Sequence, residues 1–326
     1  METLKRLLSI LLRVSISIIL ITFLFKQVDK KSLLGIIKNA DKPLLLLAFF
    51  VASTNYILCL LRWEMLLRAV NIRLPLKRVL ISFSGGTFFS LFLPSTIGGD
   101  FMRSLDLAAH TQKPREVVAT VFLDRLSGYV GLVTLALLSI VFGWRFLRDS
   151  TVLFSVAIIT TLLIFILLVL FNKFLYSKIN KFLDSSRAGK IREAIRDLHQ
   201  EIYIFRHKKR MILNNLIVSF IIQAMSPVSF YIIASSLGIK INVMYFFIFL
   251  PIIGAITLLP ISIGGLGLRD ATTIFFFAKA GVSKDLAFAM SLLSFLFILV
   301  YGAIGGLIYV LTIHHRRLQH NQSPPL

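Results

Sequence analysis

Two short stretches of this sequence combine helix-breaking residues with an arginine. The first, 94–103, reads Pro-Ser-Thr-Ile-Gly-Gly-Asp-Phe-Met-Arg, and the second, 260–269, reads Pro-Ile-Ser-Ile-Gly-Gly-Leu-Gly-Leu-Arg. Arg103 and Arg269 therefore occupy the same place in one shared pattern. A guanidinium group matches phosphate geometry in two-point contact, and glycine lets backbone N–H groups approach an anion closely. Paired interruptions of this kind in corresponding halves of a membrane protein are typical of a transport site.

Carboxylates accompany both arginines. Asp100 precedes Arg103 by three residues, which places both side chains on one face of a helix, and Asp270 follows Arg269 directly. We expect these carboxylates to balance the arginines when the site is empty, or to carry protons. In the alternative interpretation, the ion pairs only hold the helices together. Because charges buried in a membrane are costly and usually functional, the first interpretation is favoured.

A further charged pair, Asp124-Arg125, interrupts the apolar segment 117–144. It faces the same cavity in one interpretation and forms a simple interfacial charge pair in the other, since helix starts shift by a turn. Both interpretations stay open at this point. The candidate substrate-binding residues are therefore Arg103, Arg269, Asp100, Asp270, Asp124 and Arg125.

The glycines and prolines of the two motifs are expected to give shape rather than chemistry. A tight tip needs a positive φ or a close backbone approach, and a Cβ atom obstructs both. The residues concerned are Pro94, Gly98, Gly99, Pro260, Gly264, Gly265 and Gly267. In the simplest alternative, both stretches are surface loops whose prolines and glycines merely end helices.

Residues for other chemistry are scarce. Cys59 is the only cysteine, so the chain forms neither an intrachain disulfide nor a cysteine-based zinc site. The histidines form no H-E-x-x-H or similar ligand set, and we find no nucleotide-binding loop and no Ser/His/Asp arrangement. We therefore expect no catalytic residue, no metal and no cofactor, and we predict a transporter rather than an enzyme.

The composition places these motifs in a membrane protein. Hydrophobic residues make up 57% of the 326 residues, whereas soluble domains have about 45–50%. The net charge of +21 comes from 36 Lys and Arg against 15 Asp and Glu. In a membrane protein this excess belongs to cytoplasmic loops and attracts anionic lipids. Nucleic-acid binding is not expected, because the basic residues lie between apolar spans without a recognition motif.

Apolar segments of spanning length predict the membrane crossings, and shorter ones predict re-entrant hairpins. The run 79–93 reaches only about 22 Å as a helix, against a hydrocarbon core of about 30 Å. We therefore predict that 79–113 is a re-entrant hairpin. Its counterpart is the apolar run 243–259 with the second motif and a helix from Arg269 to about Lys279. The span that begins at Pro43 is expected to end at Arg62-Trp63, a charge beside an interfacial aromatic residue. The predicted spans are 7–25, 43–61, 117–144, 151–171, 211–236 and 286–313.

This pattern predicts an all-α polytopic membrane protein with about six transmembrane helices, two re-entrant hairpins and one membrane domain over 1–326. An odd number of crossings separates the motifs, so the hairpins enter from opposite faces as an inverted repeat. The positive-inside rule places both termini in the cytoplasm of a cell-membrane protein, with the five lysines of 26–42 as an exception. The predicted parts are a first half 7–171, a basic cytoplasmic loop 172–210, a second half 211–313 and a disordered tail 314–326.

The combined motifs resemble those of a known family. P-x-x-x-G-G-D-x-x-R over 94–103, D-R-x-x-G from Asp124 to Gly128, and P-x-x-x-G-G-x-G-x-R over 260–269 are similar to the flippase-like domain of the lysylphosphatidylglycerol synthase transmembrane family. The resemblance covers nearly the whole chain and implies movement of a lipid between leaflets. Larger members of this family add a soluble aminoacyl-transferase domain, which we do not expect here. Many members have Glu where this chain has Asp270.

Three functions follow from these observations. The leading hypothesis is a translocator for an anionic lipid that bears phosphate, either a phospholipid or a polyprenyl-phosphate conjugate, with a separate lipid-synthesising enzyme as a candidate partner. The second is a membrane-embedded glycosyl- or aminoacyl-lipid transferase, or its accessory subunit, with Asp100 or Asp124 as the acid–base group. The third is a scaffold that anchors a partner through 172–210.

Overall fold

The computed structural model of this protein is helical throughout the part that it describes, without a strand there. That part covers residues 30–93, 96–146, 150–171, 208–257 and 265–322, with the single positions 15, 22 and 262. The predicted all-α class is confirmed. The predicted span 7–25, almost all of the loop 172–210, and the motif residues Pro94, Pro260 and Gly264 lie outside the described residues.

Long apolar helices form the body of the protein. Within the described residues, 4 helices are long and apolar enough to cross a membrane. They correspond to the spans predicted from 43, 117, 211 and 286, and α7 (Ser150–Phe171) covers the span predicted at 151–171. The 4 helices are α3 (Lys42–Ala69), α6 (Pro114–Phe142), α10 (Lys209–Ser236) and the apolar part of α13 (Lys284–Gln322).

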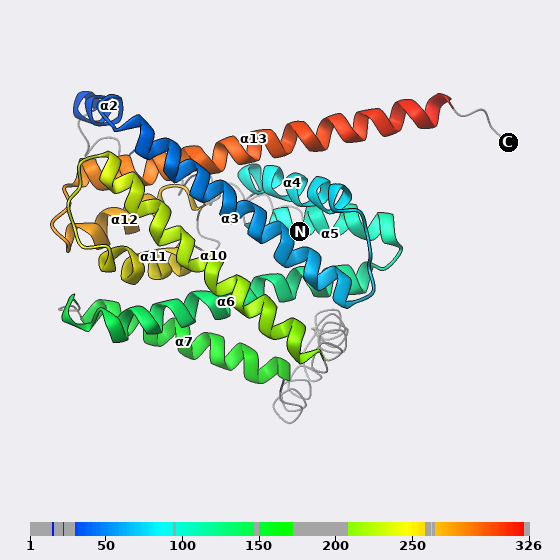
Figure 1. Ribbon diagram of the computed structural model, residues 1–326, viewed down its shortest axis with the longest axis horizontal. Helices are drawn as coiled ribbons and strands as arrows, with labels where there is room; N and C mark the ends of the chain where they lie inside the picture. The colour runs from blue at the N-terminus through cyan, green and yellow to red at the C-terminus, as the bar shows by residue number, and fades with distance from the viewer. Residues whose placement is uncertain are drawn as a thin grey trace.

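Four shorter helices form two hairpins. α4 (Leu76–Phe92) and α5 (Thr96–Thr111) pack on each other, as do α11 (Met244–Thr257) and α12 (Leu268–Ala278). The longest of them, α4, has 17 residues, which is about 26 Å and less than the thickness of a bilayer core. In Figure 1, α4 and α5 lie toward the right of the molecule, and α11 and α12 lie toward the left. Both hairpins contact α6 and α13.

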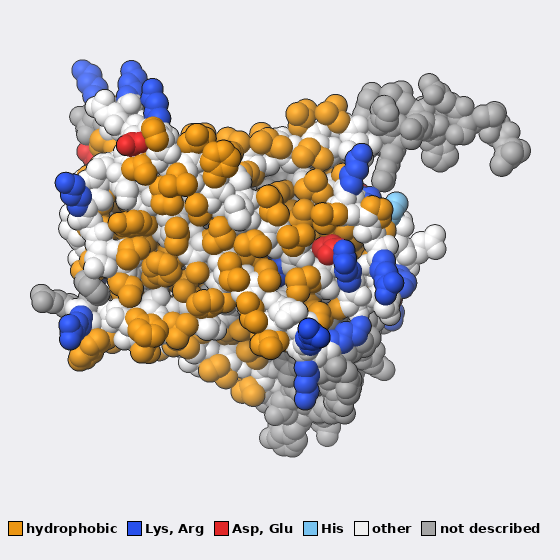
Figure 2. Space-filling view, viewed as in Figure 1, with side chains coloured by type: hydrophobic (Ala, Val, Ile, Leu, Met, Phe, Trp, Pro, Cys, Tyr) orange, Lys and Arg blue, Asp and Glu red, His pale blue; other side chains and the backbone are white. Residues whose placement is uncertain are grey.

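The surface divides into an apolar middle and two basic ends. Figure 2 shows hydrophobic side chains across the middle of the molecule and most Lys and Arg side chains toward its left and right margins. Large exposed apolar residues include Phe50, Phe154 and Leu307, on three different long helices. A surface of this kind is stable only when hydrocarbon covers it. The chain is therefore a multi-pass membrane protein.

α3 is longer than its hydropathy predicts. It begins with Asp41, whose side chain accepts a hydrogen bond from the N–H of Leu44 at 3.1 Å, and with Pro43 in its first turn. It continues to Ala69, so Arg62 and Trp63 lie well inside the helix. Both are buried, with exposed fractions of 7% and 0%. The prediction that Arg62-Trp63 closes this segment at the interface is wrong, because α3 continues beyond it and Glu64, Leu66 and Leu67 in the next turns are buried, whereas Arg68 is exposed.

Small residues bring α4 and α13 into close contact. A Cβ atom on Gly305 would lie 2.7 Å from the carbonyl oxygen of Ser84, and side chains on Gly302 and Gly306 would overlap Leu91 and Phe88. Gly302, Gly305 and Gly306 therefore form a helix-packing face. This packing fixes the first hairpin against the long C-terminal helix.

The ends of the chain add two details. α2 (Lys30–Lys38) contains the apolar stretch of the basic connector 26–42, and the one-turn helix η1 (Trp144–Phe146) follows α6. α13 continues to Gln322, so the tail that was expected to be disordered from residue 314 is helical as far as 322. The sequence explains the difference, since the first helix breaker after Gly306 is Pro324.

Candidate functional site

A network of buried charges joins three helices in the middle of the protein. Asp124 on α6 is 4% exposed, and its two carboxylate oxygens accept hydrogen bonds from Arg62 on α3 at 2.8 Å and from Arg103 on α5 at 2.9 Å. Arg103 also lies 3.0 Å from Asp100, whose second oxygen accepts a hydrogen bond from Arg125 at 2.5 Å. The pair Asp124-Arg125 thus belongs to the interior site rather than to the membrane interface.

Aromatic and polar side chains hold this network in place. The guanidinium group of Arg103 lies 4.7 Å from the ring centroid of Trp63 and 5.5 Å from that of Phe83, which is cation–π geometry. Arg62 donates a hydrogen bond to Ser219 on α10 at 3.2 Å. Arg103 therefore has contacts on both the planar face and the edge of its guanidinium group, and Arg62 has contacts along its edge, which fixes the orientation of both groups.

The first motif uses its glycines for close packing between helices. Gly98 and Gly99 lie in the first turn of α5, where a Cβ atom on Gly99 would overlap the carbonyl oxygen of Gly86 and the hydroxyl group of Ser90 on α4. A side chain at Gly98 would overlap Leu93. The glycines therefore bring α5 against α4, and this contact places Arg103 beside Asp124.

The second motif uses glycine for a backbone conformation instead. Gly265 and Gly267 have φ angles of 76° and 78°, in the left-handed region that side chains disfavour. Gly267 precedes α12, and its N–H donates a hydrogen bond to Asp270 at 3.0 Å. Asp270 also accepts hydrogen bonds from Arg269 at 3.0 Å and from Ser291 at 2.5 Å. A tight turn and an ion pair thus start α12.

A cavity of about 340 Å³ connects the two motifs. Its charged lining residues are Arg62, Asp100, Arg103, Asp124 and Arg125, and the second motif contributes Leu266. Arg269 and Asp270 do not line it. Arg269 lies 4.9 Å from the ring centroid of Phe295, which is itself part of the cavity wall. The other lining residues are Cys59, Phe83, Gly86, Thr87, Ser90, Leu91, Gly99 and Ile298.

The cavity suits an anion. The guanidinium groups of Arg62 and Arg103 that line it are buried, whereas the side chain of Arg125 is 29% exposed. Three arginines against two aspartates leave the described lining with one surplus positive charge, which an anion would neutralise. Among the described residues, no group of His, Cys, Asp and Glu has an arrangement that could hold a metal ion.

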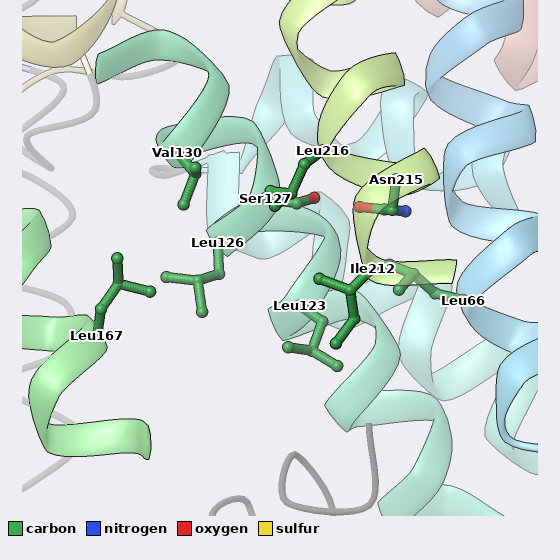
Figure 3. Close-up of a pocket in the computed structure, with 9 residues that line it drawn as sticks. All are labelled: Leu66, Leu123, Leu126, Ser127, Val130, Leu167, Ile212, Asn215 and Leu216. Carbon is green, nitrogen blue, oxygen red and sulfur yellow. The ribbon is translucent and has the colours of Figure 1, made fainter. Parts of the chain in front are cut away.

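A second pocket, of about 230 Å³, lies between α3, α6, α7 and α10 (Figure 3). Its described lining is apolar apart from Ser127 and Asn215, and none of it is charged. The amide of Asn215 also donates a hydrogen bond to the backbone carbonyl of Arg62 at 3.2 Å. This pocket cannot offset the charge of a headgroup, so the charged cavity is the candidate site.

Arg62 is the site residue that sequence reasoning assigned differently. It follows the apolar run directly and was assigned to the end of the membrane span for that reason. A usable signal was nonetheless present, because no glycine or proline occurs between Pro43 and Pro75. An unbroken helix continues about two turns beyond Arg62, which leaves Arg62 inside the helix, where a buried carboxylate is its natural partner.

Comparison with known proteins identifies the family of this chain. A family described as the lysylphosphatidylglycerol synthase TM region matches residues 10–306. The chain belongs to this family. It is 21% identical to a UPF0104 membrane protein of Pyrococcus horikoshii, over 96% of this chain and 99% of that one. It is 25% identical to a UPF0104 membrane protein of Methanothermobacter thermautotrophicus, over 78% of this chain and 80% of that one. The family resemblance read from the motifs is confirmed.

Proposed function

We propose that this protein moves a phosphate-bearing lipid between the two leaflets of a membrane. The observation that carries the proposal is the buried cavity in which Arg103, Arg62 and Arg125 converge beside two aspartates. Several charges in the interior of a membrane domain are expensive, and they usually mark the path of a polar substrate. A lipid headgroup is the polar group that a translocator must carry through this region.

The arrangement of the hairpins supports the same proposal. In Figure 1 the long helices α3, α6, α7, α10 and α13 each run between the left and right ends of the molecule. The hairpin α4–α5 starts and finishes at the right end, and α11–α12 starts and finishes at the left end. We propose that they enter the membrane from opposite faces as an inverted repeat, which is an architecture of transporters.

The proposed orientation follows from charge. In Figure 1 the α3–α4 connection and the starts of α4, α6 and α10 lie toward the right end. These segments carry basic residues, among them Arg73, Lys77, Arg115 and Lys209. Basic residues concentrate on the cytoplasmic side of membrane proteins. We therefore assign the right end to the cytoplasm.

Within this proposal the two motif arginines have unequal positions. Arg103 faces the cavity and would contact the phosphate directly. Arg269 would act from behind Phe295, where its ion pair with Asp270 fixes the start of α12. The glycine contacts of the first motif and the left-handed glycines of the second would hold both hairpins at the cavity.

Leaflet exchange in liposomes tests the proposal. Purified protein is reconstituted with a trace of a phospholipid whose headgroup or chain carries a fluorophore, and a membrane-impermeant quencher reports the outer leaflet. We expect the protected fraction to fall in vesicles that contain protein but not in protein-free vesicles. Exchange without an added donor substrate separates translocation from a transferase reaction. Equal protected fractions with and without protein, for phospholipid and polyprenyl-phosphate probes alike, would refute the proposal.

A further inference from the structure

We propose that Asp100 and Asp124 limit the cavity to headgroups that carry a single negative charge. This inference rests on the proposed function, because it concerns the headgroup that the same cavity selects. Under this proposal the two aspartates and their partners Arg62 and Arg125 determine specificity, whereas Arg103 contacts the ligand.

The pairing of the charges gives the first argument. Arg62 pairs with Asp124 at 2.8 Å, and Arg125 pairs with Asp100 at 2.5 Å. Arg103 is a third cation that contacts both carboxylates, at 2.9 Å and 3.0 Å. Each aspartate therefore keeps an arginine of its own when Arg103 turns to a ligand. Arg103 is the cation that the network can release without leaving a carboxylate unpaired.

The charge count of the cavity gives the second argument. Three arginines and two aspartates line it, so the described lining carries one surplus positive charge. The pair of Arg269 with Asp270, behind Phe295, is neutral in sum. The structure does not describe residues 94–95, 258–261 and 263–264 in and beside the two motifs. None of these residues has an ionisable side chain.

Because the charges of the cavity are buried, its surplus charge determines which headgroup binds. Arg103 and Asp124 are each only 4% exposed, so water screens their charges little. A phosphodiester brings one negative charge and would neutralise the surplus. A phosphomonoester brings about 1.5–2 negative charges near neutral pH, and the second would have no counter-charge in the site. Buried charges without a partner are strongly disfavoured, so the diester should bind more tightly.

Arg103 is the cation on which the ligand would bind. Its side chain is more than nine-tenths buried and lines the cavity. Its guanidinium group lies over Trp63, which fixes the plane of the group. A phosphate oxygen that replaces one of the two carboxylate oxygens now at its Nη2 atom would accept a charge-assisted hydrogen bond.

The test measures binding rather than transport. Full-length protein in detergent is titrated with dihexanoyl phosphatidylglycerol, a diester, and with dihexanoyl phosphatidic acid, a monoester, at about pH 8, where the monoester is doubly charged. We expect the wild-type protein to bind the diester at least about tenfold more tightly. Asp100→Asn and Asp124→Asn each add one surplus positive charge, and each should shift the affinity ratio toward the monoester by about tenfold.

The matched control is Asp106→Asn. Asp106 also forms a buried ion pair, with Arg78 at 2.7 Å, but it does not line the cavity. Its substitution should leave the affinity ratio unchanged, even if it lowers stability. If Asp124→Asn fails to fold, the test relies on Asp100→Asn. Its partner Arg125 has a side chain that is 29% exposed, so water compensates part of the charge that the substitution leaves unpaired.

Three results would overturn the inference: equal wild-type affinities, a wild-type preference for the monoester, or an equal shift of the ratio in Asp106→Asn. A further arm uses glycerophosphoglycerol, the same diester without chains. Much weaker binding of this compound supports a lipid as the ligand. Equal binding would overturn the lipid as the ligand, and with it the proposed function, while the charge limit would still be judged from the affinity ratio.

Discussion

Replacing Arg103 by lysine tests whether this residue binds substrate or only holds helices together. Lysine keeps the positive charge and can still reach one of the two aspartates. It loses the planar group that now bonds Asp124 at 2.9 Å, approaches Asp100 at 3.0 Å and stacks on Trp63 at 4.7 Å. If Arg103 binds phosphate, Arg103→Lys should slow transport while expression and membrane insertion stay nearly normal.

The size of the effect follows from the contacts that lysine cannot make. A hydrogen bond to a charged group contributes about 1.5–3 kcal/mol. Replacing the forked guanidinium group by an ammonium group would remove at least one such bond to phosphate. Since about 1.4 kcal/mol corresponds to a factor of ten, the transport rate should fall about ten- to hundredfold. Loss of the stacking contact on Trp63 would add about 0.5–2 kcal/mol, shared between stability and binding.

The assay records the initial rate of leaflet exchange per folded protein, beside the melting temperature in detergent. Arg78→Lys is the matched control, because Arg78 is another buried arginine whose carboxylate partner, Asp106, lies outside the cavity. Transport should fall in Arg103→Lys far more than in Arg78→Lys at similar loss of stability. If Arg103→Lys transports normally, or if both variants lose activity only in proportion to stability, Arg103 is structural and the site assignment is wrong.

Other predictions use the same two measurements or a labelling assay. Gly99→Val should abolish most transport with every charge intact, because its side chain would overlap the α4 backbone; wild-type activity in this variant would contradict the packing argument. Arg62→Leu should lower stability by about 1–3 kcal/mol, since it removes one buried hydrogen-bonded partner of Asp124 while Arg103 still neutralises the carboxylate; an unchanged denaturation midpoint would show that the pair is not needed. In a Cys59→Ser background, cysteine at Arg73 should resist membrane-impermeant thiol reagents in intact cells, whereas cysteine at Lys240 should react; the reverse pattern would invert the topology.

Much of the fold could be predicted from the sequence because lipid imposes a simple rule on composition. Spans must be apolar and about 20 residues long, so the long helices α6, α7 and α10 and the start of α13 were predicted from hydropathy within a few residues. The two short apolar runs were recognised because each is interrupted before it could cross. The repeated motif and its neighbours then identified the family.

The tertiary structure decided which charges form the site. Hydropathy describes the local environment of a residue, whereas an ion pair depends on which distant residues the packing brings together. Asp124 and Arg62 lie 62 positions apart in the chain and meet only because α3 and α6 pack side by side. For the same reason Arg125 could not be assigned to the cavity or the interface from its position alone.

The motif glycines show the same division. Their pattern predicted that shape matters at both motifs, because a side chain would obstruct either a turn or a close approach. The structure assigned the close approach to Gly99 and the positive φ to Gly265 and Gly267. The two Gly-Gly pairs therefore have different structural roles, since the first lies in a helix that packs against α4 and the second precedes α12. The sequence determined a membrane protein with two glycine-arginine motifs, and only the packing of its helices determined that Arg103 faces the cavity while Arg269 lies behind Phe295.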